Sequence, residues 1–339
     1  MNTTSPAQTA TITNTTASAV TMGSVVASSG YGVTHTCGAV LAAGATCTVT
    51  VTFTPPAALS GAAVPGTVSV LYAGGGPTFV ILNGTSERSL VTHYYRSILR
   101  RAPDAGGKTF WESEATRVAA LGASVNEVWF AMAQAFYFST EYAAFARNNT
   151  GFATDLYNTF FNRAPDSGGL AFWVGQLDAG MPREVALTSF MFSTEFGNFT
   201  QAIFGSTAAR AEVNAVMDFY RGLLSRLPDN SGFGFWVGRF RSAQCSATPQ
   251  AAIILEVEAI SSAFALSPEY TARGRSNSQY VGDLYNAFLR RGGDVGGVQH
   301  WINQLNTGAM TREQVRREFV ASAEFNARVV AIVQQGCFS

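Results

Sequence analysis

The stretch NRAPDSGGLAFW, residues 162–173, decides how the larger part of this chain is interpreted, because close copies of it occur four times. The other copies are RRAPDAGGKTFW at residues 100–111, SRLPDNSGFGFW at 225–236 and RRGGDVGGVQHW at 290–301. The motif acids Asp104, Asp166, Asp229 and Asp294 follow one another at intervals of 62, 63 and 65 residues. These intervals exceed those of ordinary helical-pair solenoids, so each copy is expected to belong to a small helical subdomain.

Four residue types keep a fixed distance from the motif Asp in every copy. A Tyr lies nine residues before the Asp, at Tyr95, Tyr157, Tyr220 and Tyr285. An Arg lies three residues before it, at Arg101, Arg163, Arg226 and Arg291. A Gly follows three residues after it, at Gly107, Gly169, Gly232 and Gly297, and a Trp seven residues after it, at Trp111, Trp173, Trp236 and Trp301.

These spacings predict two helices joined by a tight turn. In the second copy, Phe152, Leu156 and Phe160 recur at the spacing of one helix face. The Pro before the Asp is expected to end this helix, and the Asp to cap the next one, which carries the Trp. We expect the Gly to permit the turn, the Arg to pair with the Asp across the loop, and the Tyr and Trp to meet in the core.

A second, shorter motif ends each repeat: FSTEY at 138–142, FSTEF at 192–196, LSPEY at 266–270 and ASAEF at 321–325. A Ser that precedes an acidic residue at a helix start is typical of an N-cap, with the Glu favourably placed in the first turn.

The N-terminal segment has a different composition, because no charged residue precedes Glu87. Its alternating stretches, TATIT at 9–13 and CTVTVTFTP at 47–55, predict strands of a two-sheet sandwich. The expected fold class is therefore α+β and multidomain, with an immunoglobulin-like β-sandwich followed by an all-α array of four repeats. The predicted domains are residues 1–86 for the sandwich and 87–148, 149–208, 209–275 and 276–339 for the helical repeats.

The four cysteines permit three pairings, of which we favour Cys37 with Cys47 and Cys245 with Cys337. The first pair belongs to the β-rich segment and the second to the helical part. Unpaired thiols in a reducing compartment are the alternative. No spacing typical of a zinc site is present.

The N-terminal run from TCGAVLAAGATC at residue 36 to FVILNGT at 79–85 resembles the choice-of-anchor D modules of bacterial surface proteins. These modules are immunoglobulin-like relatives of the ASPM, SPD-2 and Hydin domain, and the resemblance covers about residues 5–85. Such modules usually have another strand before the segment that aligns with SPAQTATITN, residues 5–14. This implies either a sheet edge open to strand addition by a neighbour or a terminus that lacks a dispensable strand.

The motifs R-x-P-D-x-G-G and S-x-E-[YF] resemble an uncharacterised bacterial repeat family, a domain of unknown function of secreted and surface-layer proteins, and more distantly the helical repeat of phycobilisome linkers. The resemblance spans about residues 88–330. It implies an extracellular protein with a scaffold, assembly or adhesion role and no catalysis. The fourth copy lacks the Pro and carries His300 before its Trp, and the third has Ser231 in place of the first Gly.

Composition and motifs also restrict the function. The 22 basic and 22 acidic residues balance, which argues against a nucleic-acid partner, and no apolar run is long enough for a membrane span. No nucleophile elbow, phosphate loop or metal-ligand cluster occurs, so we predict no enzyme and no cofactor. The motif acids Asp104, Asp166, Asp229 and Asp294 are weak calcium candidates, but capping is the better interpretation, because calcium needs about six to eight oxygen ligands.

Two functions remain. The first is a non-catalytic structural protein of the cell exterior or bacterial surface, which self-associates into a layer, sheath or filament with copies of itself or other surface proteins. The second is a secreted adhesin that binds surface glycans or a partner protein. No signal peptide is recognisable in this numbering.

Overall fold

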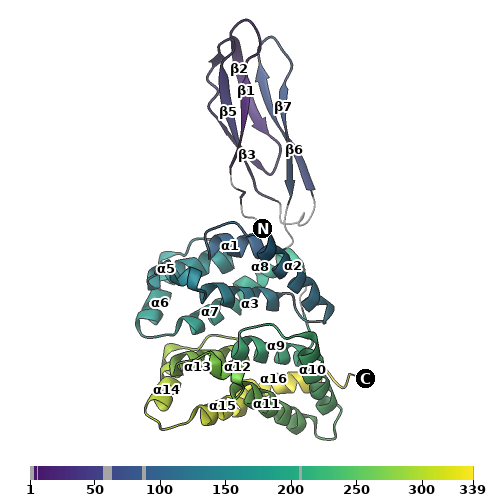
Figure 1. The fold of residues 1–339 in the computed structure, drawn as a ribbon, viewed down its shortest axis with the longest axis vertical. Helices are drawn as coiled ribbons and strands as arrows, with labels where there is room; N and C mark the ends of the chain where they lie inside the picture. The colour runs from purple at the N-terminus through teal and green to yellow at the C-terminus, as the bar shows by residue number, and fades with distance from the viewer. Residues whose placement is uncertain (1–3, 6, 56–62, 86–88, 206–207, 339) are drawn as a thin grey trace. The chain divides into compact units, whose positions relative to one another are not determined.

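The computed structural model describes residues 4–5, 7–55, 63–85, 89–205 and 208–338 (Figure 1). The chain divides into two compact units, Met1–His93 and Tyr94–Ser339. The first unit holds the strands and the second unit the helices, apart from the first three residues of α1, which belong to the first unit; this confirms the predicted α+β class. The predicted boundary at residues 86 and 87 lies outside the described residues.

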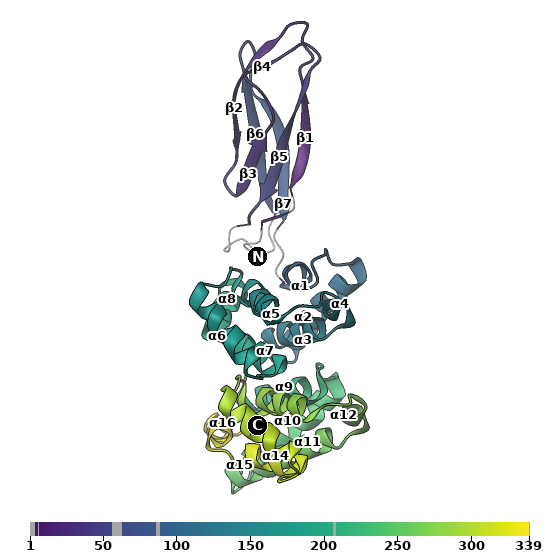
Figure 2. The same ribbon diagram turned by 90° about the vertical axis from the view of Figure 1, so that its left-hand side faces the viewer.

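The first unit contains two antiparallel sheets (Figure 2). One sheet has the order β1 (Gln8–Thr13), β5 (Thr46–Phe53), β3 (Tyr31–His35). The other has the order β4 (Val40–Leu41), β2 (Val20–Ala27), β6 (Ala63–Tyr72), β7 (Thr78–Thr85). Every second residue of β5, from Cys47 to Phe53, is buried, as the Thr and Val alternation predicts. Val49 and Val51 of β5 pack with Val68 and Val70 of β6, so the two sheets share one core.

The second unit repeats one arrangement of four helices. The first repeat contains α1 (Val91–Ser97), α2 (Ala105–Ala120), α3 (Asn126–Tyr137) and α4 (Thr140–Ala143). The second contains α5 (Asn149–Leu156) with a π-helical turn at Tyr157–Phe161, α6 (Ser167–Asp178), α7 (Arg183–Met191) and α8 (Thr194–Phe204). The third contains α9 (Ala211–Leu224), α10 (Asn230–Gln244), α11 (Pro249–Ala265) and α12 (Pro268–Ala272). The fourth contains α13 (Asn277–Leu284) with a π-helical turn at Tyr285–Leu289, α14 (Val295–Asn306), α15 (Arg312–Ala321) and α16 (Ala323–Gln334).

The first helices of neighbouring repeats meet at small residues. A Cβ atom added to Gly222 in α9 would lie 2.5 Å from the backbone nitrogen of Ala287, so only glycine permits this approach. At the corresponding place in the first two repeats, the Thr159 hydroxyl bonds to that of Ser97 at 3.0 Å. The first repeat thus packs with the second, and the third with the fourth.

A buried ionic network joins these pairs of repeats. The fully buried Arg221 of α9 donates to Glu127 of α3 and, at 2.5 Å, to Asp218. Arg290 of the fourth repeat donates to Glu127 at 2.9 Å, and Arg328 of α16 donates to Asp218. A buried charge is tolerated only when it is paired and hydrogen-bonded, so this network fixes how the repeats are placed against one another. No helix among the described residues has both the length and the apolar character that a membrane span requires.

Candidate functional site

Each motif Asp caps the second helix of its repeat. The carboxylates of Asp104, Asp166, Asp229 and Asp294 accept the backbone N–H of the Gly three residues later at 2.7, 2.8, 2.8 and 2.8 Å. The Gly107 N–H lowers the pKa of Asp104 in this way. At the third repeat, the Ser231 hydroxyl and then the Gly232 N–H lower the pKa of Asp229 to about 2. The carboxylate therefore satisfies a helix N–H group that would otherwise lack a partner.

The first helix of each repeat ends at a residue with left-handed backbone, and not at the Pro that was predicted to end it. The residue just before the motif Arg has left-handed backbone in every repeat, with φ of 58° at Arg100 and 51° at Asn162, Ser225 and Arg290. Such a residue terminates a helix by turning the chain. The fourth repeat ends in the same way without a Pro, so the prediction that Pro stops this helix is wrong. The Pro residues of the other copies lie beyond the turn.

The motif Gly also has a role other than the predicted one. Gly107, Gly169 and Gly232 lie inside the first turn of the second helix and have no positive φ. A Cβ atom at these positions would lie 2.0, 2.2 and 2.3 Å from the hydroxyl oxygen of the motif Tyr. The Gly is thus required because the Tyr hydroxyl occupies the space of a side chain, and its predicted role in the turn is wrong.

The motif Arg lies closer to the Glu of the S-x-E-[YF] motif than to the motif Asp. Arg101 donates to both carboxylate oxygens of Glu141, at 2.6 and 3.1 Å, whereas its Asp104 contact is 3.4 Å long. The same two-bond contact joins Arg163 to Glu195, Arg226 to Glu269 and Arg291 to Glu324. Arg101 lowers the pKa of Glu141. This pair was not predicted from the sequence, although both residues recur once in every repeat.

Each motif Arg also covers its motif Tyr, and a Phe joins that Tyr to the motif Trp. The Arg101 guanidinium lies 4.8 Å from the Tyr95 ring centre, within the range of a cation–π contact. The bridging residues are Phe136, Phe190, Phe264 and Phe319, with Tyr–Phe distances of 4.8, 5.2, 4.7 and 5.3 Å and Trp–Phe distances of 6.2, 4.9, 5.9 and 5.7 Å. In each repeat the Tyr and the Trp therefore contact the same Phe ring.

One aromatic of the motif points to solvent. Phe110, Phe172 and Phe235, each directly before a motif Trp, are 54, 57 and 57% exposed, and each meets that Trp edge to face. His300 takes this place in the fourth repeat and is also exposed. Because more than half of each of these three Phe side chains is exposed, this position is a candidate contact site.

Two buried carboxylates connect repeats within each pair. Asp155 accepts from Tyr142 at 2.8 Å and from two nitrogens of Arg147, at 2.8 and 3.0 Å. Asp283 accepts from Tyr270 at 2.9 Å and from two nitrogens of Arg275, at 2.9 and 2.7 Å. In both cases the donors precede a predicted repeat boundary and the carboxylate follows it. This link was not predicted, because its Arg and Asp members lie outside both repeated motifs.

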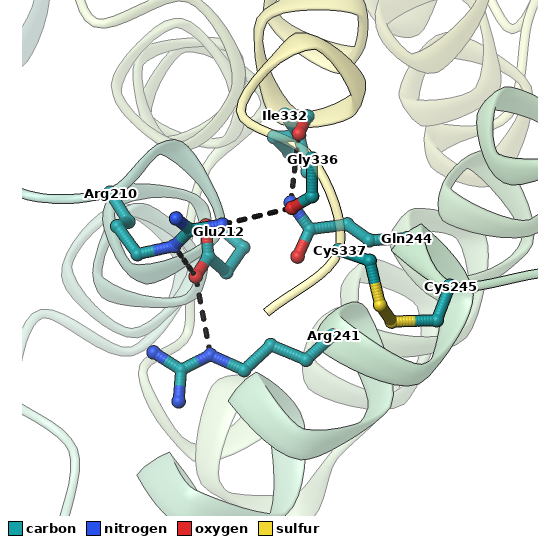
Figure 3. Close-up of a disulfide and its surroundings, with 8 residues drawn as sticks. All are labelled: Arg210, Glu212, Arg241, Gln244, Cys245, Ile332, Gly336 and Cys337. Carbon is teal, nitrogen blue, oxygen red and sulfur yellow. Dashed lines mark hydrogen bonds and ion pairs between the residues drawn. A yellow bond between two sulfur atoms is a disulfide. The ribbon is translucent and has the colours of Figure 1, made fainter. Parts of the chain in front are cut away.

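The disulfides join Cys37 to Cys47 and Cys245 to Cys337, which confirms the predicted pairing. Figure 3 shows the second disulfide, which fastens the segment after α16 to the end of α10. Beside it, Gln244 donates to the Ile332 carbonyl at 2.8 Å, and Arg210 to the Gly336 carbonyl at 3.1 Å. The segment after α16 is thereby fixed to the third repeat.

The first unit has a groove between two edge strands. Among the described residues, β1 pairs only with β5 and β7 only with β6, so each has an unpaired edge. A groove of about 380 Å³ lies between them, with Ala10 on β1, Val51 on β5, and Val80 and Leu82 on β7 among its lining residues. On the outer face of β7, Phe79 and Ile81 are 53 and 78% exposed.

The predicted calcium candidates do not come together in the described part of the chain. The four motif acids lie at separate helix N-termini, and the described part of the chain contains no group of three or more His, Cys, Asp or Glu residues placed to hold a metal ion. Each of these carboxylates caps a helix instead. The motif thus organises the repeat, and the groove and the exposed rings are the features that folding does not explain.

Comparison with known proteins finds a family match in two segments of the helical unit. Residues 133–199 and 261–329 each match a family described as a domain of unknown function (DUF4214). Each match covers the end of one repeat and most of the next, and so includes the Tyr and Asp link between them. No curated protein and no solved structure matches the chain.

Proposed function

We propose that this protein is a non-catalytic structural protein of the cell exterior that self-associates through the open side of its N-terminal sandwich. The observation that carries the proposal is the pair of unpaired edges on β1 and β7 with the groove between them. The contact adds a strand from a second copy, and repetition of this contact builds a layer, sheath or filament.

The edge on β7 lacks the features that usually prevent strand addition. Natural edge strands are protected by charged side chains, Pro, bulges or short length. β7 is eight residues long, contains no Pro and has a regular register with β6. No charged residue precedes Glu87, so two copies of this surface do not repel each other electrostatically. Phe79 and Ile81 add exposed apolar surface beside the edge.

The covalent structure supports the location. Two disulfides and no free cysteine among the described residues favour an oxidising compartment, as found outside the cell. We further propose that the first unit is a choice-of-anchor D type, immunoglobulin-like module, and that all four helical repeats are copies of one bacterial surface-protein repeat. The shared caps and Arg–Glu pairs support the second statement.

The test is the mass of the full chain by light scattering over a concentration series. Wild type is expected to grow with concentration, whereas the variant Phe79→Lys/Ile81→Lys stays monomeric, because it places charges beside the β7 edge. Val40→Lys is the matched control, since Val40 is 59% exposed on β4, the other edge strand of the same sheet. A wild type that stays monomeric at every concentration would overturn the proposal. Equal growth of both variants would show that assembly uses another surface.

The exposed motif rings favour adhesion as a second candidate. An aromatic ring beside a Trp offers a stacking surface for a sugar, and the repeats would present several such rings at once. Binding to a glycan array by wild type, and its loss in Phe110→Ser/Phe172→Ser/Phe235→Ser, would favour this function. An array without any bound glycan would count against it.

A further inference from the structure

A polar cavity of about 220 Å³ lies inside the helical unit, where residues from all four repeats line its wall. They include Gln134 of α3, Glu184 of α7, Ser225 at the end of α9 and Asn286 in the turn after α13. Phe138, which is 44% exposed, also lines the cavity, so the cavity reaches the protein surface. Pockets for drug-sized ligands enclose about 300–1,000 Å³, so this one suits a smaller molecule.

The charges in the wall balance one another. Its cations are Arg273 and Arg275, and its anions are Asp283 and Glu184. Arg275 donates to both carboxylate oxygens of Asp283, at 2.9 and 2.7 Å, and lies 3.5 Å from Glu184. Arg273 lies 3.8 Å from Asp283. Because each charge already has a counter-charge, and an unpaired charge is costly to bury, the cavity favours a neutral ligand over an ion.

Three polar groups in this wall have unused hydrogen-bonding capacity. Gln134 is only 8% exposed, and its Oε1 is buried without a hydrogen bond among the described residues. Within the same part of the chain, the 3.5 Å contact with Arg275 is the one polar contact of the Glu184 carboxylate. Asn286 is 2% exposed and accepts from Arg221 through its Oδ1 at 2.8 Å, which leaves its Nδ2 to donate. A hydroxyl group, which both donates and accepts, is the neutral group that matches such a wall.

Phe138 gives the cavity a second kind of surface. It directly follows α3 and lies four residues after Gln134, so both side chains are on the same side of that helix. Its exposed ring therefore borders the hydrogen-bonding wall. A sugar ring carries hydroxyl groups around its edge and an apolar C–H face, which packs on aromatic rings. Water satisfies the polar groups but offers no apolar face to Phe138, so the combination favours a sugar over water alone.

We propose that this cavity binds one neutral sugar unit, either a free monosaccharide or the terminal unit of a glycan. One sugar hydroxyl donates to Gln134 Oε1, a second accepts from Asn286, and the C–H face of the ring packs on Phe138. The site uses none of the residues on which the proposed assembly, or adhesion through the exposed motif rings, rests. Because residues of all four repeats line the cavity, binding also stabilises the packing of one repeat pair on the other.

Saturation-transfer difference NMR of the full chain tests the proposal, with glucose, galactose, mannose and N-acetylglucosamine titrated separately through the millimolar range. At least one of them is expected to give a saturable signal. Glucosamine and glucuronate, which carry a charge on the same type of ring, are expected to bind more weakly than the neutral sugar, because the wall has no charge left to pair with them. Equal binding of the sugar and its methyl glycoside would identify the end of a glycan as the ligand, and loss of binding on methylation would identify a free monosaccharide.

Two variants locate the site. Gln134→Met removes the buried acceptor at nearly constant volume and is expected to weaken binding by about three- to tenfold, the usual worth of one hydrogen bond. Phe138→Ala removes the ring and is expected to weaken binding as well. The matched controls, which should bind as wild type does, are Gln176→Met, at a half-buried Gln of α6, and Leu266→Ala, at the corresponding exposed place in the third repeat. Thermal unfolding verifies that each variant is folded.

Three results would contradict the proposal. The first is the absence of a saturable signal with all four neutral sugars, and the second is wild-type affinity in both Gln134→Met and Phe138→Ala. The third is loss of binding in Phe110→Ser/Phe172→Ser/Phe235→Ser, which would place the sugar on the exposed motif rings instead. The light-scattering test of assembly changes none of these residues, so the proposed assembly and the proposed sugar site can fail independently.

Discussion

Replacement of Gly169 by Ala tests the explanation given for the motif glycines. A Cβ atom at Gly169 would lie 2.2 Å from the Tyr157 hydroxyl oxygen, whereas an ordinary contact is about 3.4 Å or longer. The Tyr157 ring has little room to retreat, because it is 5% exposed and packs against Phe190 at 5.2 Å. Overpacking of this kind costs about 1–3 kcal/mol, which for a unit of this size lowers the unfolding temperature by roughly 2–12 °C.

The neighbouring Gly168 is the matched control. It lies in the same helix turn, and a Cβ atom there would lie 3.5 Å from the nearest atom, an Asp166 carboxylate oxygen. Gly168→Ala is therefore expected to be neutral or to stabilise by up to about 1 kcal/mol, the usual gain from Ala in a helix. In the fourth repeat the Tyr285 hydroxyl is 3.2 Å from the corresponding position, so Gly297→Ala should cost less than Gly169→Ala.

The assay is thermal and urea unfolding followed by far-UV circular dichroism, which reports mainly the helical unit. The double variant Gly169→Ala/Tyr157→Phe removes the hydroxyl, after which the nearest ring atom, Cζ, lies 3.2 Å from the new Cβ. It is expected to recover most of the stability that Gly169→Ala loses relative to Tyr157→Phe alone. Equal unfolding temperatures for Gly168→Ala and Gly169→Ala, or no recovery in the double variant, would refute the reasoning.

Three further predictions concern the helical unit. Arg221→Met leaves Glu127 and Asp218 with less counter-charge in the core and should cost about 3–5 kcal/mol in urea unfolding, whereas Arg317→Met, at an exposed site, should change stability by less than about 0.5 kcal/mol. Cys245→Ala/Cys337→Ala opens a covalent link between residues 92 positions apart and should cost about 4–5 kcal/mol, together with earlier proteolytic release of the C-terminal segment; an unchanged unfolding temperature would contradict this. The folded-state pKa of Asp229 is about 2, below its unfolded value of about 3.9, so its contribution to the free energy of unfolding is complete above about pH 4 and is lost as the pH falls towards 2. Acid unfolding of Asp229→Asn should therefore lack that part of the pH dependence.

The sequence predicted what is local or repeated at short spacing. Period-two alternation located strands such as β5, and the fixed distances around the motif Asp predicted the capped second helix. The cysteine pairing followed from the contrast in composition between the two parts of the chain. In each case, the residues that carry the sequence pattern and the contact that it predicts belong to one element or one domain.

Contacts between distant elements were harder to predict. Arg101 and Glu141 are 40 residues apart, and no rule of helix spacing connects them. The motif position requires Gly because a Tyr hydroxyl from another helix occupies the space of a side chain. The groove between β1 and β7 depends on which strands end at the edges of two sheets, and period-two alternation carries no information on strand order.

The links of Asp155 and Asp283 restrict how such a chain can be shortened or lengthened. Each carboxylate takes its Arg and Tyr partners from the preceding repeat. Deletion of the first or third repeat alone would leave a buried acid without its cation, at a cost that rivals the whole stability of a small domain. The smallest segment that gene duplication or protein engineering can add or remove without breaking the Asp155 or Asp283 link is therefore a pair of repeats, and by this criterion an array of this kind should grow in steps of two.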